Sequence, residues 1–317
     1  MSIECSTTSK SQFDILGNQL LIRAPGKINL SLLIAGKRPD GYHDIETVMA
    51  KINWFDEILI EKGDNKGIEL IRKGPYEVPG GEDNLVYKAT KLILDSAGQA
   101  PPYDYDNGSQ DTAVKITLTK NIPVGSGLGS GSSDAAATLM GINKFLKLGL
   151  SKKALAGLAV RLGSDVAFFL DGPLAFCTGR GEKIKKLKQK FSFSALLILP
   201  DVNVPTKKVY AHYVHDRALY EKLHCEIDAL IEKNRIDLLS RMCANMLSNS
   251  CFELHNELVE LKGKIERLDI GPLCLSGSGS AMFCIINNDN EEGVRKYQHK
   301  LQHDFGCRSI IVSNNSW

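Results

Sequence analysis

A glycine-rich segment in the middle of the chain constrains its fold more than any other stretch. Four of the seven residues 125–131 are glycines, an alternating apolar pattern at 114–119 precedes them, and a helical pattern follows them. Glycines let backbone N–H groups curl around an anion, and a helix N-terminus adds free N–H donors and a positive dipole end. The segment therefore predicts a phosphate-binding loop between a strand and a helix, capped by Ser132, Ser133 or Asp134. A tight turn without a ligand is the alternative.

The spacing within this loop excludes two common nucleotide-binding loops. A Walker A loop needs Ser or Thr after Gly-Lys, and each Gly-Lys of this chain is followed by Ile or Arg. The dinucleotide fingerprint G-x-G-x-x-G fails from Gly125, Gly127 and Gly129, because its last position holds Ser or Asp each time. The loop must therefore be of another kind.

Strand and helix patterns are mixed along both halves of the chain, which places it among α/β or α+β proteins. Strands are predicted at 28–35, 58–60, 114–119, 166–170, 195–199, 281–286 and 309–312. Helices are predicted at 132–148, 151–162, 217–233, 236–265 and 290–302. Residues 97–112 have the composition of an exposed loop, and the Lys-rich stretch 180–193 suits a domain boundary. We expect an N-terminal extension over 1–20, to which no motif can be assigned. Two domains are expected to follow it, over 21–184 and 185–317.

Composition and charge exclude several classes of function. Lys and Arg number 39 and Asp and Glu number 37, so a formal net charge of +2 favours neither nucleic acid nor an anionic membrane. No apolar run approaches the ~18 residues of a membrane span, and the N-terminus lacks the pattern of a signal peptide. The eight cysteines include no C-x-x-C pair. We therefore expect a reducing cytoplasm and no disulfide, with Cys177, Cys274 and Cys284 as small buried hydrophobic residues.

Two further positions suggest chemistry from the residues alone. Lys27 and Asn29 lie two residues apart, so they share one face of an otherwise apolar strand. Asp165 follows a helix that is expected to end at Gly163 and precedes the apolar run 166–170. A carboxylate at such an element edge can bind a hydroxyl group and accept its proton. A surface aspartate is the alternative for Asp165.

Three segments together resemble the motifs of a known superfamily. Ala24–Leu30, Pro123–Ala137 and Leu275–Ala281 are similar, in content and order, to the three motifs of the GHMP small-molecule kinases, and the resemblance spans residues 21–315. It implies an α+β fold of two domains, an ATP-binding ribosomal-protein-S5-like α/β domain and a C-terminal ferredoxin-like α/β domain, with the active site in the cleft between them. Pro39–Ile45 also resembles the signature of one member, whose acceptor alcohol carries a cytidine diphosphate group. Glu82–Leu85, Gly163–Val166 and Pro205–Thr206 stand where that member has similar residues.

The resemblance also implies an activity and its participants. The chain is expected to transfer phosphate from ATP, with Mg²⁺, to a hydroxyl group of the cytidyl acceptor, in non-mevalonate isoprenoid precursor biosynthesis. No residue is assigned as a metal ligand. We expect a small-molecule substrate, no nucleic acid, no membrane and no obligate protein partner, so that the chain is a monomer or weak dimer.

The resemblance assigns residues to each part of this reaction. Lys27 and Asp165 are the implied catalytic pair, in which Asp165 removes the hydroxyl proton or only orients the hydroxyl, and Lys27 holds Asp165 ionised. The implied ATP-binding residues are Asn84, Lys120, Pro123, Gly125, Ser126, Gly127, Leu128, Gly129, Ser130, Gly131, Ser132 and Ser133. The implied substrate-binding residues are Asn29, Tyr42, His43, Thr206, Tyr210, Ser276, Gly277 and Gly279, with the two tyrosine rings stacking on cytosine. Lys51, Lys207 and Lys208 are candidates for contacts with the substrate diphosphate.

Two other functions remain as alternatives. Another GHMP kinase, acting on homoserine, mevalonate or a sugar, would have no use for an aromatic cage around cytosine. A catalytically silent nucleotide-binding protein of the same fold would be expected to lack Lys27 or Asp165, and both are present.

Overall fold

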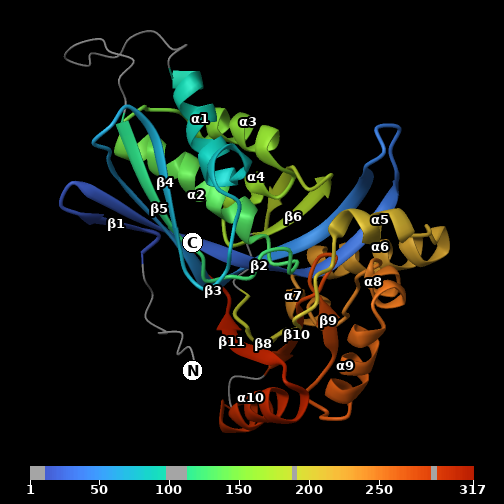
Figure 1. Cartoon of the computed structure of the whole chain (residues 1–317). Helices are drawn as coiled ribbons and strands as arrows, with labels where there is room; N and C mark the ends of the chain where they lie inside the picture. Colours follow the sequence, from blue (N-terminus) through green and yellow to red (C-terminus); the bar gives the residue numbers. More distant parts are fainter. Residues whose placement is uncertain (1–10, 98–112, 188–190, 287–290) are drawn as a thin grey trace.

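Two β-sheets, one from each half of the sequence, organise the chain (Figure 1). The computed structural model describes residues 11–97, 113–187, 191–286 and 291–317. The first sheet contains β1 (Phe13–Leu16), β2 (Gln19–Lys37), β3 (His43–Lys62), β4 (Gly67–Lys73), β5 (Ala113–Thr119), β6 (Leu174–Gly179) and β7 (Lys183–Lys186). The second contains β8 (Ser194–Leu199), β9 (Leu273–Leu275), β10 (Met282–Ile286) and β11 (Arg308–Ser313), in the order β11-β8-β10-β9.

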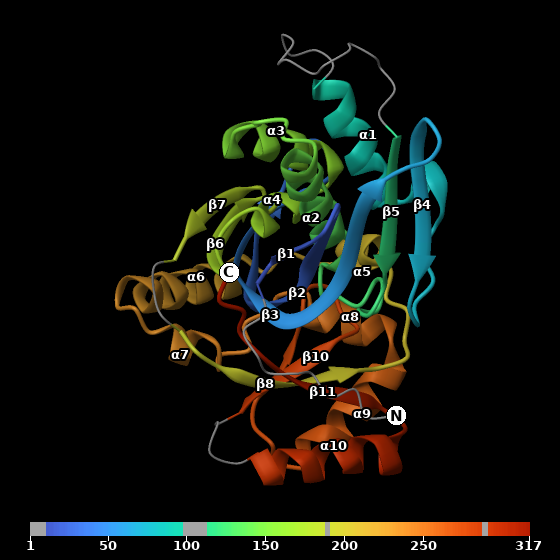
Figure 2. The same ribbon diagram turned by 90° about the vertical axis from the view of Figure 1, so that its left-hand side faces the viewer.

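Helices cover both sheets. The first sheet carries η1 (Gly81–Asp83), α1 (Leu85–Ala97), α2 (Ser130–Phe145), α3 (Lys152–Leu162) and α4 (Val166–Phe169). The second half contributes α5 (Thr206–His212), α6 (Arg217–Glu232), α7 (Ile236–Leu239), α8 (Ser248–Leu254), α9 (Asn256–Glu266) and α10 (Glu291–Phe305). In Figure 2, α9 and α10 lie on the side of the second sheet that faces away from the first. The α+β prediction is confirmed.

A long antiparallel hairpin of β2 and β3 joins the two halves. β5 pairs with β3 over 57–62 and β6 pairs with it over 45–50, while β2 runs along the other edge of β3. Lys27 and Lys51 are opposite each other in this hairpin, directly after a register shift between Pro25 and Lys27. Opposite residues of an antiparallel pair point to the same face, so both lysines approach the same layer of helices.

The hydrophobic core is shared across the hairpin. One cluster packs Ile28 and Leu33 of β2 with Leu197 of β8 and Phe283 of β10, and all four are fully buried or nearly so. A second cluster fills the space between the first sheet and α1 to α4. Because residues of both halves belong to one core, the segments at their junction are held in a fixed relation.

Most predicted elements form, and three do not form as expected. The helix after the glycine loop starts at Ser130, with Gly129 rather than Ser132, Ser133 or Asp134 in the cap position. Residues 166–170, expected as a strand, form the short helix α4 instead. The helix expected over 236–265 is divided into α7, α8 and α9. The loop expected over 97–112 lies almost entirely outside the described residues.

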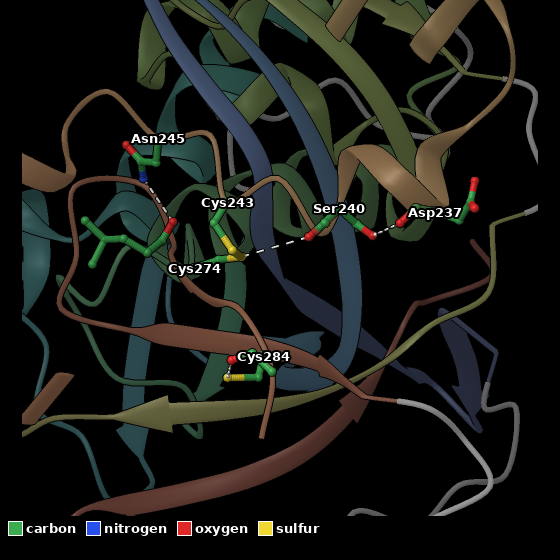
Figure 3. Close-up of a disulfide and its surroundings, with 8 residues drawn as sticks. Asp237, Ser240, Cys243, Asn245, Cys274 and Cys284 are labelled. Atoms are coloured by element: carbon green, nitrogen blue, oxygen red, sulfur yellow. Dashed lines mark hydrogen bonds between the residues drawn. A yellow bond between two sulfur atoms is a disulfide. The ribbon is translucent and has the colours of Figure 1, made fainter. Parts of the chain in front are cut away.

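The expectation that no cysteines are joined is wrong. Cys243, in the segment between α7 and α8, forms a disulfide with Cys274 of β9, and their Cα atoms lie 4.7 Å apart (Figure 3). Cys177 and Cys284 are buried free thiols, as expected. Two residues after Cys243, Asn245 forms an isolated parallel β-bridge with Leu32 of β2. The disulfide-linked segment therefore also contacts the hairpin. The pairing joins positions 31 residues apart in sequence, and no local pattern indicates it.

None of the helices in the described ranges is sufficiently long and apolar to span a membrane.

Candidate active site

The three motifs that lie far apart in the sequence meet around the glycine loop. The backbone N–H of Lys27 donates to Leu128 O at 2.9 Å, and the backbone N–H of Ala281 donates to Ser126 O at 3.0 Å. The carbonyl oxygen of Gly127 accepts from Lys27 Nζ at 2.7 Å and from Ser276 Oγ at 3.0 Å. The loop is therefore fixed from both sides, by β2 of the first sheet and by the segment that follows β9.

Side chains within the loop divide into two groups. Leu128 is fully buried in the core, and Ser126 donates from its hydroxyl to Pro123 O at 2.8 Å, so both stabilise the loop itself. The hydroxyl of Ser133 is buried and has no hydrogen-bond partner among the described residues. An unsatisfied hydroxyl in the first turn of α2 is available to a ligand. Pro123 and Ser126 also line a cavity of about 240 Å³, together with Tyr76, Glu77 and residues 199–203.

Lys27 connects this loop to Asp165. Its Nζ atom lies 3.9 Å from Asp165 Oδ2 and donates to Asn29 Oδ1 at 2.5 Å. Burial lowers the pKa of Lys27, and the negative charge of Asp165 opposes that shift. Asn29 in turn donates to Thr47 Oγ1 at 2.8 Å, which fixes its amide orientation. Lys27 and Asn29, singled out from one pattern, and Asp165, singled out from another, thus form one cluster.

Asp165 stands directly before α4, and the far end of this helix is held by Lys51. The buried ammonium of Lys51 donates to Phe169 O at 3.1 Å and to Asp171 O at 2.7 Å. Burial, together with the charges of Lys152 and Lys186, lowers the pKa of Lys51 to about 7. The expectation that Lys51 contacts the substrate diphosphate is therefore wrong, because its side chain is only 1% exposed and binds backbone carbonyls.

Aromatic rings gather at the far end of the β2–β3 hairpin. The rings of His43 and Tyr210 lie 5.4 Å apart with an interplanar angle of 36°, and Tyr213 meets His43 edge-on at 6.0 Å. Tyr42 is 55% exposed. Burial and the charges of Lys37 and His215 lower the pKa of His43, so its ring is neutral at pH 7.

We call the rings of Tyr42, His43, Tyr210 and Tyr213 the aromatic cage. Of these, Tyr210 lies within the electrostatic influence of Asp165. Burial raises the pKa of the Tyr210 hydroxyl, and the negative charge of Asp165 adds to that shift. Tyr213, which directly follows α5 in an extended conformation, was not indicated by the motifs.

The side chains of Lys120 and Asn84 are hydrogen-bonded to other protein groups and do not project freely into the site. The Lys120 ammonium is buried between the carboxylates of Asp56 and Asp134, and these two charges raise its pKa despite the opposite effect of burial. The Asn84 side chain donates to Pro79 O and accepts from Val86 N, both at 2.8 Å, and so caps the start of α1. Asp56 was missed, since a lysine partner 64 residues away leaves no local pattern, and Asp134 was singled out only as a possible helix cap.

The third motif, Leu275–Ala281, mainly holds the glycine loop in place. Thr206 Oγ1 and Ser278 Oγ are hydrogen-bonded at 2.9 Å, which links the start of α5 to this motif. Asn245 donates to Leu275 O at 2.9 Å and to Gly277 O at 2.8 Å, so it holds the turn that contains Gly277 and Gly279. Figure 3 shows Asn245 pointing at β9 from the segment that the disulfide attaches. Asn245 was also missed, because a single asparagine carries no pattern.

Comparison with known proteins places the chain in a class. The model of the GHMP kinases N terminal domain matches residues 84–173, and that of the GHMP kinases C terminal matches residues 227–303. The chain therefore belongs to the GHMP kinases and is a small-molecule kinase, which implies ATP as the phosphoryl donor.

Individual relatives identify the family within the GHMP kinases to which the chain belongs. A 4-diphosphocytidyl-2-C-methyl-D-erythritol kinase of Bacillus cytotoxicus is 37% identical over 275 residues, which are 86% of this chain and 90% of that protein. One of Bacillus cereus is 36% identical over 272 residues, with the same coverage. A crystal structure of 4-(cytidine 5'-diphospho)-2C-methyl-D-erythritol kinase aligns with a TM-score of 0.71 at 30% identity and covers 94% of this chain and 100% of that one. Within the GHMP kinases, the chain belongs to the 4-diphosphocytidyl-2-C-methyl-D-erythritol kinase family.

The fold is also common to more distant kinases. A homoserine kinase from Cytophaga hutchinsonii has a TM-score of 0.71 at 19% identity, over 97% of this chain and 98% of that one. At that level of identity the likeness concerns the fold alone.

Proposed function

We propose that the chain transfers the γ-phosphate of ATP to the 2-hydroxyl of 4-diphosphocytidyl-2-C-methyl-D-erythritol, in non-mevalonate isoprenoid precursor biosynthesis. The observation that carries the proposal is the position of the Lys27–Asp165 pair, with 3.9 Å between Nζ and Oδ2. On one side of the pair Lys27 binds the glycine loop, and on the other the aromatic cage lies within the electrostatic reach of Asp165. A phosphate donor and a cytidyl acceptor can therefore meet at this pair.

Asp165 and Lys27 divide the chemical work. Asp165 binds the acceptor hydroxyl, orients it and accepts its proton as the oxygen attacks the γ-phosphorus. Lys27 faces Asp165 and offsets the negative charge that develops on the transferring group. Because phosphoryl transfer has a loose transition state, orientation of the hydroxyl matters more than the base strength of Asp165.

The glycine loop is proposed to bind the ATP phosphates through its backbone N–H groups and the N-terminus of α2. The residues present fit a Mg²⁺–ATP complex, since the Ser133 hydroxyl is buried beside the loop without a partner in the described ranges. Ser133, with Ser130 and Ser132, would contact the complex directly or through water. When bound, Mg²⁺ neutralises phosphate charge and so lowers the barrier to attack. Because the side chains of Lys120 and Asn84 bind protein groups, we propose that they shape the wall of the nucleotide site.

The acceptor is proposed to bind with its cytosine between Tyr42 and Tyr210, whose rings stack on the two faces of the base. His43 hydrogen-bonds the base edge, and Asn29 and Thr206 contact the rest of the acceptor together with the backbone at Ser276, Gly277 and Gly279. We further propose a cytoplasmic location and action without an obligate protein partner. We place the domain division after β7 (Lys183–Lys186) rather than at 184/185, because this strand belongs to the first sheet.

A coupled ADP-release assay with the purified chain tests this function. The cytidyl acceptor, homoserine and mevalonate are each supplied with ATP and Mg²⁺, and only the cytidyl acceptor is expected to give ADP above background. Turnover of homoserine or mevalonate without turnover of the cytidyl compound would replace the proposed substrate and leave the family assignment in place.

A further inference from the structure

Arg180 lies in the tight turn that connects β6 to β7, next to the aromatic cage. Gly179 pairs with Ile45 of β3, so this turn is adjacent to the hairpin end that carries Tyr42 and His43. The guanidinium carbon of Arg180 is 4.8 Å from the centre of the Tyr42 ring. Stacking of this kind fixes the plane of the guanidinium and leaves its N–H groups free at the edges.

The same turn also reaches Asp165. A methyl group placed on Gly181 would lie 3.5 Å from Asp165 Oδ1 and 3.7 Å from the backbone oxygen of Ser164. Consecutive residues of one turn therefore touch the ring proposed to stack on cytosine and the carboxylate proposed to bind the reacting hydroxyl. Arg180 therefore belongs to the turn that links these two points.

Arg180 also differs from Arg38 and Lys51, two other cations near the cage. Arg38 is bound by the carboxylates of Asp40 and Asp44, at 3.1 Å and 2.8 Å. Arg180 forms no ion pair within 4 Å in the part of the chain that the structure describes, although its charge helps to lower the pKa of Asp40. Lys51 is buried beneath α4, as shown above. An arginine that is held in place but not neutralised is available to an anion.

We infer that Arg180 binds the diphosphate group of the acceptor substrate. This inference rests on the proposed function, because in that substrate a diphosphate joins the cytidine to the alcohol that is phosphorylated. With the base at Tyr42 and the hydroxyl at Asp165, the diphosphate must pass the Arg180 turn. The planar fork of a guanidinium matches two phosphate oxygens, which a lysine ammonium does not.

Binding of cytidine, CMP and CDP by calorimetry tests the inference without depending on catalysis. The wild-type chain is expected to bind CDP more tightly than CMP. Arg180→Gln should weaken CDP binding roughly tenfold to a hundredfold, as expected for the loss of charge-assisted hydrogen bonds, and leave ATP binding unchanged. Arg180→Lys should restore part of the affinity. In turnover assays, Arg180→Gln should raise the KM of the cytidyl acceptor and leave that of ATP unchanged.

Two further variants make the result specific. Lys185→Gln removes the same charge from an exposed position on β7 and should leave CDP affinity as in the wild type. The double variant Lys207→Gln/Lys208→Gln tests the two exposed lysines of α5, the remaining rivals for the diphosphate. Melting temperatures of all variants show whether each is folded.

The outcomes separate this inference from the proposed function. If Arg180→Gln binds CDP as tightly as the wild type, or if only the Lys207→Gln/Lys208→Gln variant weakens binding, the assignment of Arg180 is wrong and the proposed function stands. If the wild-type chain binds no cytidine nucleotide and releases no ADP with the cytidyl acceptor, both are overturned.

Discussion

At the scale of single residues, Lys27 holds the site together through oxygen atoms of three separate segments. Its ammonium binds Asn29 Oδ1 on its own strand and Gly127 O in the loop, and faces Asp165 before α4. A buried ammonium without such partners would be strongly unfavourable, and burial indeed lowers the pKa of Lys27. The carboxylate of Asp165 therefore supports the charged form of Lys27, in addition to its proposed role in binding the hydroxyl.

Replacing Asp165 by Asn tests the role of this carboxylate. The variant keeps the shape of the side chain but removes its charge, so turnover should fall roughly 10²–10⁴-fold. The KM values for ATP and acceptor should change only a few-fold, since the loop and the cage are untouched. Steady-state kinetics with the cytidyl acceptor measure both. Turnover near that of the wild type would refute Asp165 as the base and leave the family assignment intact.

At the scale of elements, α4 is fixed at both ends by lysines that face each other across β2 and β3. Lys27 lies beside Asp165 at the start of the helix, and Lys51 donates to Phe169 O and Asp171 O at its end. A cation at the C-terminal carbonyls of a helix is favourable, as is an anion at its N-terminus. The register of one hairpin thus sets the position of the candidate base.

Lys51→Met is expected to lower kcat without a matching change in KM. Methionine fills a similar volume but cannot donate, so two carbonyl groups lose their partner and α4 can shift. Because small displacements of catalytic groups are costly, kcat should fall about tenfold or more. Lys62→Met, at an exposed position of the same strand, serves as the control. An unchanged kcat in Lys51→Met would mean that α4 is fixed by packing alone.

The lowered pKa of Lys51 also predicts how stability depends on pH. The unfolded chain holds this proton up to pH 10.5, whereas the native state releases it near pH 7. Between these values the unfolded state binds more protons, so native stability rises with pH by up to ~1.4 kcal/mol per unit. The free energy of unfolding of the wild type, relative to Lys51→Met, should therefore grow from pH 6.5 to pH 9.5 in urea titrations. A difference independent of pH would show that native Lys51 keeps its proton.

Local patterns account for elements whose apolar period is regular. The alternation at 114–119 and the Ser151 cap of α3 were sufficient to predict β5 and α3, and Ser151 accepts from Ala154 N as a cap should. The run 166–170 is apolar throughout and has no period, so it does not distinguish a strand from the buried helix α4. The helix expected over 236–265 is interrupted where Cys243 and Asn245 contact distant strands.

Part of the candidate site could also be predicted from local sequence patterns. Lys27, Asn29 and Asp165 were found because each stands out within its own segment, and the structure brings them together. The burial of Lys51 and Lys120 depends on Phe169 and Asp56, partners more than 60 residues away, which no local pattern contains. The role of Arg180 likewise follows from the pairing of β6 with β3.

At the scale of the whole molecule, the two halves meet where the glycine loop touches the third motif. A methyl group on Gly127 would lie 2.1 Å from Ser276 O and 3.1 Å from Gly279 O, so only glycine permits this approach. The contact lies between the two sheets, next to the core that they share. It therefore couples the stability of the N-terminal half to that of the C-terminal half.

Alanine substitutions at Gly127 and Gly125 form a matched pair that isolates this contact. Both glycines have positive φ, +79° and +70°, so each substitution strains the backbone by about 1–2 kcal/mol. A methyl group on Gly125 meets only Asn203 Oδ1, at 3.9 Å, whereas one on Gly127 must displace the third motif. Gly127→Ala should therefore lower the free energy of unfolding by about 3 kcal/mol or more, and Gly125→Ala by about half as much.

The two variants should also differ in how the chain unfolds. Trp54 of β3 lies in the core cluster shared by both halves, and the ring of Trp317, which follows β11, stacks on Phe55 of the first sheet, so their fluorescence reports on the junction of the two halves. Circular dichroism reports on the helices of both halves. In the wild type and in Gly125→Ala the two signals should change together in urea, because the halves unfold as one unit. In Gly127→Ala the transitions should separate, since the contact that couples the halves is broken. Coincident transitions in Gly127→Ala, with equal destabilisation of both variants, would show that the shared core alone couples the two halves.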